Sequence, residues 1–207
     1  MITTSFNNLD IEKQKRIIDA ALEEFAANGY EKASTNQIVK NAGIGKGMLF
    51  YYFQNKKELY NYLVDYCLDV TTTEFINRMD TSEPDFIERL KYIARIKTDY
   101  HLKHPNVLNF LGSVFINEGG LPDNFKKRHA EIMMLGNSKL YDNIDTSLFG
   151  NDIDTEKAFK LIQWSMEGYQ NELIARLKSQ SLATVNFDPY WDEFYDYIEV
   201  LKTVYYK

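Results

Sequence analysis

The chain has 207 residues, 44% of them hydrophobic, which suffices for one or two domains with apolar cores. Only 4 Pro and 10 Gly occur, which argues against a loop-rich β protein. Cys67 is the single cysteine, so an internal disulfide is excluded and a reducing cytoplasm is expected. No signal peptide is visible in the first ten residues, and no apolar run approaches the roughly 20 residues that span a bilayer. We therefore expect a cytoplasmic protein without a membrane partner.

The net charge of −6 opposes nucleic-acid binding until its distribution is considered. Residues 1–57 carry eight basic and six acidic side chains, a net +2, so the remainder carries −8. We call residues 1–57 the head and the remainder the body. The mildly basic head would approach a polyanion more readily than the acidic body, although surface charge also divides unevenly by chance.

Apolar residues recur with helical spacing from the start of the chain. A first helix buries one stripe and ends near Gly29; the stripe consists of Ile17, Ile18, Ala21, Leu22 and Phe25. A second helix begins at Ser34, where Gln37 completes a capping box, and stops at Gly43. A third short helix covers residues 46–53.

Helical patterns continue to the end of the chain. A capping signal at Asn55 starts a long helix, and Pro84 suits the first turn of the next. Four more helices are predicted over residues 105–117, 123–142, 155–179 and 189–207. The chain is therefore expected to be all-α, with about nine helices and no strand.

Three short helices joined by tight turns have the form of a helix-turn-helix unit. On the third helix, Leu49 and Phe53 are four residues apart and should point into a small core. The remaining surface is unusual for a solvated helix: Gly47, Met48, Phe50 and Tyr51. It suits a helix that enters the major groove, where a missing side chain lets backbone approach DNA and aromatic edges meet thymine methyl groups.

Phosphate contacts are expected around this helix. Thr35 places a hydroxyl beside the free amides of a helix N-terminus, which is a ready phosphate site. Lys46 and Lys56 bracket the third helix and could each hold a phosphate on either side of the groove.

Four segments of this head together resemble a known family: IIDAALEEFAANGY at 17–30, STNQI at 34–38, AGIGKGMLFYYF at 42–53 and NKKEL at 55–59. Over about residues 11–63 the chain resembles the TetR/AcrR family of bacterial repressors. The resemblance implies a helix-turn-helix DNA-binding domain at 1–54 and a ligand-binding and dimerisation domain at 55–207. It further implies a homodimer, a palindromic double-stranded operator, and release when a small molecule binds. We expect neither enzymatic activity nor a cofactor.

The resemblance also assigns DNA contacts by position: Thr35, Asn36, Lys46, Gly47, Met48, Phe50, Tyr51, Tyr52 and Lys56. Many members have Ser or Thr where Gly45 and Met48 stand, Tyr at position 50 and His at position 52. These departures remove polar groups, so the operator sequence cannot be transferred from other members.

The last two helices are amphipathic, and we expect them to form half of a four-helix dimer interface. The predicted interface residues are Phe159, Ile162, Met166, Gly168, Tyr169, Leu173, Leu177, Trp191, Phe194, Tyr195, Ile198 and Leu201. Gly168, with Ser165 nearby, gives a small-residue patch for close helix approach. The alternative is that both helices simply cover one protomer's core.

Aromatic and methionine side chains in the middle helices are candidates for the wall of an effector pocket: Tyr92, Tyr100, Phe110, Phe115, Met133, Met134 and Trp164. Such a wall favours an apolar or aromatic effector. The net negative charge of the body slightly favours a cationic effector. The competing interpretation is that these residues are core.

The sequence gives little support for a metal site or for catalysis. His101 and His104 are three residues apart, but no third metal ligand is evident, and no nucleophile–base–acid set can be assembled. Two alternatives stay open: a DNA-binding activator or architectural protein without a ligand, and a small-molecule-binding helical bundle with an incidental three-helix head.

Overall fold

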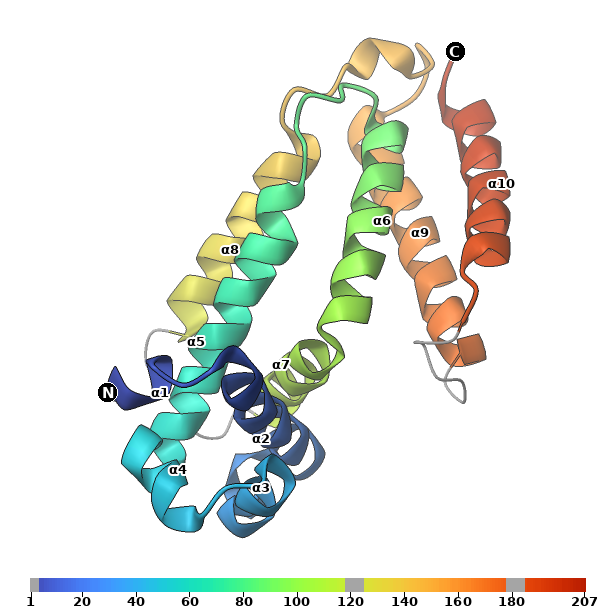
Figure 1. Cartoon of the computed structure of the whole chain (residues 1–207). Coiled ribbons are helices and arrows are strands. Elements are labelled where there is room, and N and C mark those ends of the chain that lie inside the picture. Colours follow the sequence, from blue (N-terminus) through green and yellow to red (C-terminus); the bar gives the residue numbers. More distant parts are fainter. Residues whose placement is uncertain (1–3, 118–124, 178–184) are drawn as a thin grey trace. The chain divides into compact units, whose positions relative to one another are not determined.

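The computed structural model describes residues 4–117, 125–177 and 185–207, and it is helical throughout that part of the chain (Figure 1). The prediction of an all-α protein is confirmed. Ten α-helices lie in these ranges, with two short 3-10 turns and one isolated β-bridge between Phe149 and Tyr206. The additional helix is the four-residue α1 (Thr4–Asn7), which the sequence analysis missed because four residues carry no periodicity.

The longer α-helices agree with the predicted segments to within a few residues. They are α2 (Ile11–Lys32), α3 (Thr35–Ala42), α4 (Lys46–Phe53), α5 (Lys56–Glu74), α6 (Phe86–Lys103), α7 (Pro105–Asn117), α8 (Phe125–Tyr141), α9 (Thr155–Leu177) and α10 (Asp188–Tyr205). The predicted caps at Ser34 and Asn55 are confirmed, since their side chains accept the backbone N–H groups of Gln37 and Glu58. The capping box is wrong in its second half, because the Ser34 amide donates to Glu24 and the Gln37 side chain donates to Asn41.

The start of α6 corrects the sequence analysis. Pro84 lies before the helix, and the capping group is Asp85, whose carboxylate accepts the backbone N–H groups of Ile87 and Glu88 at 2.9 and 3.2 Å. A carboxylate at this position satisfies two amides that have no partner inside the helix.

The chain divides into two compact units. The first comprises Met1–Arg78 and Ile96–Asn137, and the second comprises Met79–Arg95 and Ser138–Lys207. Helices α6 and α8 each contribute residues to both. The predicted functional boundary after residue 54 stays a prediction.

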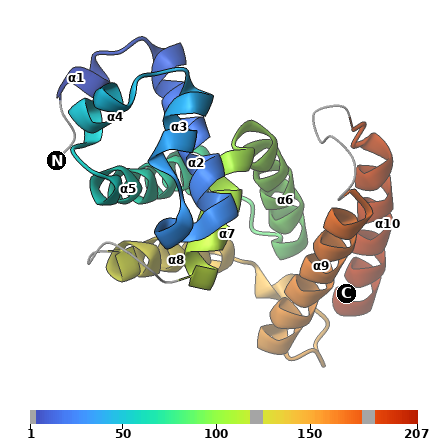
Figure 2. The same cartoon turned by 90° about the horizontal axis from the view of Figure 1, so that it is seen from below.

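Helix α2 is the centre of the first unit, where it packs against α3 and along α7 (Figure 2). The ring of Phe110 on α7 is fully buried and meets Phe25 at 6.4 Å and Tyr60 at 5.4 Å between centroids. Asn106, at the start of α7, donates to the carboxylate of Glu23 at 3.2 Å. An aromatic cluster and a polar contact therefore join α2 to α7.

The second unit has its own core, built from the first half of α6 with α9 and α10. Its buried residues are Phe86, Ile87, Leu90, Phe149, Ala158, Ile162, Phe194 and Ile198. Arg89 is fully buried beside this core, and its guanidinium donates to five backbone carbonyls: those of Thr81, Glu83, Lys139, Leu140 and Asp142. A buried cation is tolerated here because carbonyl oxygens surround its donors.

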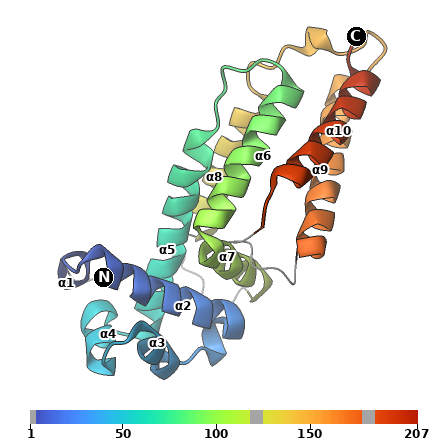
Figure 3. The same ribbon diagram turned by 45° about the vertical axis from the view of Figure 1, so that its right-hand side comes forward.

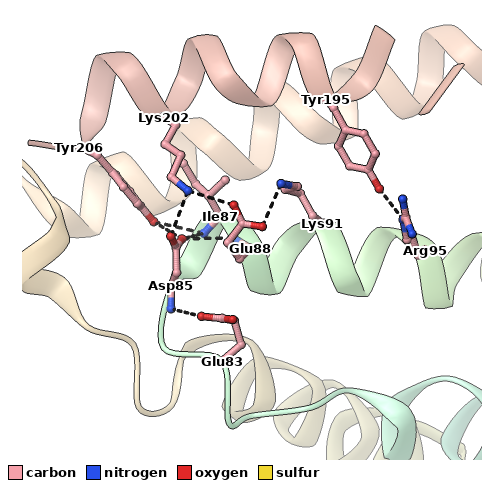
Figure 4. A network of polar contacts seen from close by, with 9 residues as sticks. All are labelled: Glu83, Asp85, Ile87, Glu88, Lys91, Arg95, Tyr195, Lys202 and Tyr206. Carbon is pink, nitrogen blue, oxygen red and sulfur yellow. Dashed lines mark hydrogen bonds and ion pairs between the residues drawn. The ribbon is translucent and has the colours of Figure 1, made fainter. Parts of the chain in front are cut away.

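A polar clasp also joins α6 to α10 in this unit (Figure 4). The ammonium of Lys202 lies 3.3 Å from the carboxylate of Asp85 and 3.0 Å from that of Glu88. The hydroxyl of Tyr206 donates to Asp85 at 2.7 Å. Partial burial alone would raise the pKa of both carboxyl groups, but these hydrogen bonds, with one from Lys91 to Glu88, hold both pKa values below their usual range.

We expect this clasp to weaken in acid. A carboxyl group whose pKa is lowered by folding stabilises the chain above the usual carboxyl pKa near 4, and that stability is lost as the pH falls through the lower, folded value. Lys202→Met should therefore lower the free energy of unfolding by about 1 kcal/mol at neutral pH, and by much less near pH 3. Urea unfolding at the two pH values measures the difference.

Lys157→Met is the matched control, because Lys157 pairs with Asp154 on the exposed surface at the start of α9. This variant should unfold much as the wild type does at both pH values. A stability loss for Lys202→Met that is equally large at both pH values would contradict the prediction.

Candidate nucleic-acid interface

Helix α4 is divided between a buried and an exposed side. Leu49 and Phe53 are both almost completely buried, as their spacing predicted. On the other side, Tyr51 is 58% exposed and Met48 is 40% exposed. Phe50 lies between the two and is half-buried. The outward surface of α4 is therefore apolar and aromatic, which a helix that only meets water does not need.

A tight turn connects α3 to α4 and sets the direction of α4. Gly43 ends α3 with φ 66°, in the left-handed region that favours glycine. Its backbone N–H returns to the carbonyl of Lys40, and that of Ile44 to Val39. The two helices are thereby held as a helix-turn-helix pair.

Gly47 lies in the first turn of α4 and is exposed. A Cβ atom built there would meet no neighbouring side chain or element within 4 Å. Packing inside the chain therefore does not require glycine at this position, although glycine weakens a helix relative to alanine. Close approach of a binding partner to the backbone would explain why glycine stands at position 47.

The start of α3 offers a second polar edge. The amides of Ser34 and Gln37 are already bonded, to the Glu24 carboxylate at 2.8 Å and to the Ser34 hydroxyl at 3.4 Å. The amides of Thr35 and Asn36 are those that a phosphate can use. Asn36 is exposed and Thr35 is half-buried, while the nearby carboxylate of Glu24 opposes an anion.

Two residues assigned as DNA contacts also make interactions within the head. Tyr52 is only 2% exposed, and its ring packs 5.7 Å from that of Phe6. Lys56 donates through Nζ to the carbonyl of Glu31 at 3.0 Å, and the same ammonium lies 5.1 Å from the centre of the Tyr30 ring. Lys46 differs from both, since it is exposed at the start of α4.

The candidate pocket residues are divided between the two units. Tyr100 and Phe110 are buried in the first unit, while Met133 and Met134 of α8 are exposed. In the second unit, Tyr92 is exposed and Trp164 is 61% exposed. The side chain of Phe115 lies outside the described residues.

The apolar stripes of α9 and α10 that we predicted as a dimer interface cover the core of the second unit. Ile162, Phe194 and Ile198 are buried in it, and partly buried neighbours pack around them, namely Phe159, Met166, Tyr169, Trp191, Tyr195 and Leu201. Leu177 is also buried and Leu173 partly so, which leaves Gly168 as the exposed member of the set.

The part of the chain that the structure describes holds neither a candidate membrane span nor a candidate metal site. No helix there combines the length and the apolar character that crossing a membrane requires. No three or more His, Cys, Asp or Glu side chains in that part of the chain are grouped so that they could hold a metal ion.

Sequence comparisons point to one class of protein. Residues 17–63 match the family model described as "Bacterial regulatory proteins, tetR family". An uncharacterised HTH-type transcriptional regulator of Bacillus subtilis, YuxN, is 32% identical over 113 residues, which are 54% of this chain and 36% of that protein. An HTH-type transcriptional regulator of Staphylococcus aureus is 29% identical over 175 residues, covering 79% of this chain and 91% of the relative.

Solved structures agree in fold. A TetR family transcriptional regulator from Chloroflexus aurantiacus has a TM-score of 0.68 and 24% identity, with 100% of this chain and 99% of that chain covered. A TetR family regulator from Marinobacter aquaeolei has a TM-score of 0.60 and 15% identity, with 92% of each chain covered. At these identities the likeness concerns the fold.

The contacts of Lys56 predict a structural role for it. Lys56→Met keeps the aliphatic stem but removes the ammonium that bonds the end of α2 and lies over Tyr30. The variant should lose about 1 kcal/mol of stability, or roughly 2–4 °C in melting temperature. Thermal unfolding followed by circular dichroism measures the shift.

Lys57→Met is the matched control, because the neighbouring Lys57 is exposed. Its melting temperature should stay at the wild-type value. Equal melting temperatures for Lys56→Met and the wild type would show that the ammonium does not hold the head together.

Proposed function

The chain belongs to the TetR family of helix-turn-helix transcriptional regulators, and from this premise we propose that it is a repressor that binds a palindromic operator through α4 and releases it when a small molecule binds the body. The observation that carries the proposal is the outward side of α4, where Met48 and Tyr51 are exposed and where packing inside the chain does not require glycine at position 47. Figure 3 shows α3 and α4 together at one end of α5.

The chemistry of α4 suits the major groove. Met48 and Tyr51 offer methyl and aromatic surface to thymine methyl groups, and Lys46 offers a cation to a phosphate. Gly47 allows the backbone of the first turn to lie close to the duplex. The half-buried Phe50 and Lys56 stay at the edge of the proposed contact set, since one bond to Glu31 leaves the Lys56 ammonium with further donors. The burial of Tyr52 disfavours a direct contact from its side chain.

Gly47→Ala separates recognition from folding. The added methyl group has open space inside the chain, so the melting temperature should stay the same or rise slightly, since alanine favours helix. Against a duplex selected by the wild-type protein from a random-sequence pool, affinity should fall about tenfold or more, because the methyl group separates backbone and DNA. Fluorescence anisotropy measures the binding.

Gly112→Ala is the matched control, since Gly112 is exposed on α7 and a Cβ atom there also meets nothing within 4 Å. It should bind the duplex like the wild type. Wild-type affinity in Gly47→Ala would exclude close contact at Gly47, and failure of the wild type to select any sequence would refute DNA recognition altogether.

The contact between α7 and α2 supports a ligand-controlled repressor. The buried ring of Phe110 and the amide of Asn106 tie α7 to α2, which carries the helix-turn-helix pair. A small molecule that displaced α7 would therefore shift α2 and change the presentation of α4. The effector itself we expect to be apolar or aromatic, in keeping with the aromatic and methionine content of the body.

The second apolar faces of α9 and α10 support a homodimer. On α9 the exposed face carries Leu161, Trp164 and Gly168, and on α10 it carries Tyr197, Val200 and Val204. Both sets follow a three-then-four spacing, as in helices that pack side by side. We place the dimer interface on these faces rather than on the stripes that cover the core, and assign the covering partner as a second copy of this chain.

Val200→Glu should split such a dimer, because it places a carboxylate where an apolar interface would bury it. We expect half the wild-type mass by light scattering at micromolar concentration, with helical content preserved. Met134→Glu is the matched control, since Met134 is 73% exposed on α8 and lies outside the proposed interface. A wild type that is monomeric, or a Val200→Glu variant that stays dimeric, would contradict the proposed interface.

A further inference from the structure

The short helix α1 packs directly against α4 (Figure 2). Phe6 is completely buried, although it is only the sixth residue of the sequence. Its ring stands 4.7 Å from that of Phe53, 5.7 Å from that of Tyr52 and 5.6 Å from that of Tyr62 on α5, between centroids. Phe6 therefore fills the space behind α4, on the side opposite its exposed surface.

A hydrogen bond joins α1 to the exposed side of α4 as well. The hydroxyl groups of Ser5 and Tyr51 are 2.9 Å apart. Tyr51 is the most exposed aromatic side chain of α4, and this contact restricts where its ring can lie. The contact connects residues that are 46 positions apart in the sequence.

Helix α1 is itself fixed to the beginning of α2. The side-chain amide of Gln14 donates to the carbonyls of Asn7 and Leu9 at 3.2 and 2.8 Å. The backbone N–H of Leu9 returns to Phe6 at 3.1 Å, and Asp10 caps α2. Helix α1 therefore contacts both α4 and the beginning of α2.

We propose that Ser5 and Phe6 are positioning residues for DNA recognition, with Phe6 supporting α4 from behind and Ser5 orienting the Tyr51 ring. The inference rests on the proposed function, because it assigns a task to α1 within the same interface. It requires no contact between α1 and DNA. Preorganising an exposed aromatic side chain lowers the entropy that binding must otherwise remove.

A double-mutant cycle tests the role of Ser5. With the duplex selected by the wild-type protein, Ser5→Ala and Tyr51→Phe should each weaken binding about threefold. The double variant should also bind about threefold more weakly than the wild type, rather than about ninefold, because both changes remove one shared interaction. Melting temperatures should stay within a degree or so of the wild type, since the bond lies on the surface.

Ser82→Ala is the matched control. The Ser82 hydroxyl is also exposed and also makes a side-chain hydrogen bond, to Asp80 at 2.8 Å, but it lies before α6. This variant should bind the duplex with wild-type affinity. Undiminished affinity in Ser5→Ala would overturn the positioning role, and so would independent, multiplying losses in the double variant.

Hydrogen exchange tests the role of Phe6 without DNA. Phe6→Leu keeps an apolar side chain but loses the ring contacts, so amides of α4 should exchange about tenfold faster while those of α9 stay unchanged. Unchanged exchange in α4 would overturn the support by α1. A wild type that selects no duplex would instead refute the proposed function and, with it, the recognition role of Ser5, whatever the exchange rates show.

Discussion

The packing of one side of α4 against the rest of the head is the constraint on which the proposed function depends. An eight-residue helix has little stability alone, so α4 exists because Leu49, Tyr52 and Phe53 are buried. Burial of those three side chains leaves Gly47, Met48 and Tyr51 outside on the same short helix. This single division supplies the exposed surface that the proposed DNA recognition requires.

Some aromatic and basic groups of the head stabilise the head itself. Tyr52 joins the ring cluster around Phe6, and the ammonium of Lys56 closes the end of α2 over Tyr30. Such groups still govern recognition, because they decide where α4 lies. The location of a residue in the fold therefore distinguishes residues that position α4 from residues that are proposed to contact DNA.

The features predicted best from the sequence are those that depend on neighbouring residues alone. Ser34 and Asn55 cap helices, and Gly43 takes a positive φ, because each satisfies neighbouring backbone groups whatever the rest of the chain does. Helical spacing predicted the burial of Leu49 and Phe53 and the exposure of Gly47 and Tyr51, but it did not predict the burial of Tyr52. By contrast, α9 carries apolar residues on two faces, and periodicity alone does not decide whether Ile162 or Trp164 meets the core. Helix α1 is too short for periodicity, and the burial of Phe6 depends on residues 46 or more positions away.

Photo-crosslinking from α4 to DNA tests the central claim most directly. A photoreactive phenylalanine analogue would replace Tyr51 in one preparation and the equally exposed Tyr197 of α10 in another, each bound to the duplex that the wild-type protein selects. The account predicts a covalent adduct with bases of the selected site from position 51 and none from position 197. A bound duplex that crosslinks from position 197 and not from position 51 would show that α4 is not the surface that reads DNA.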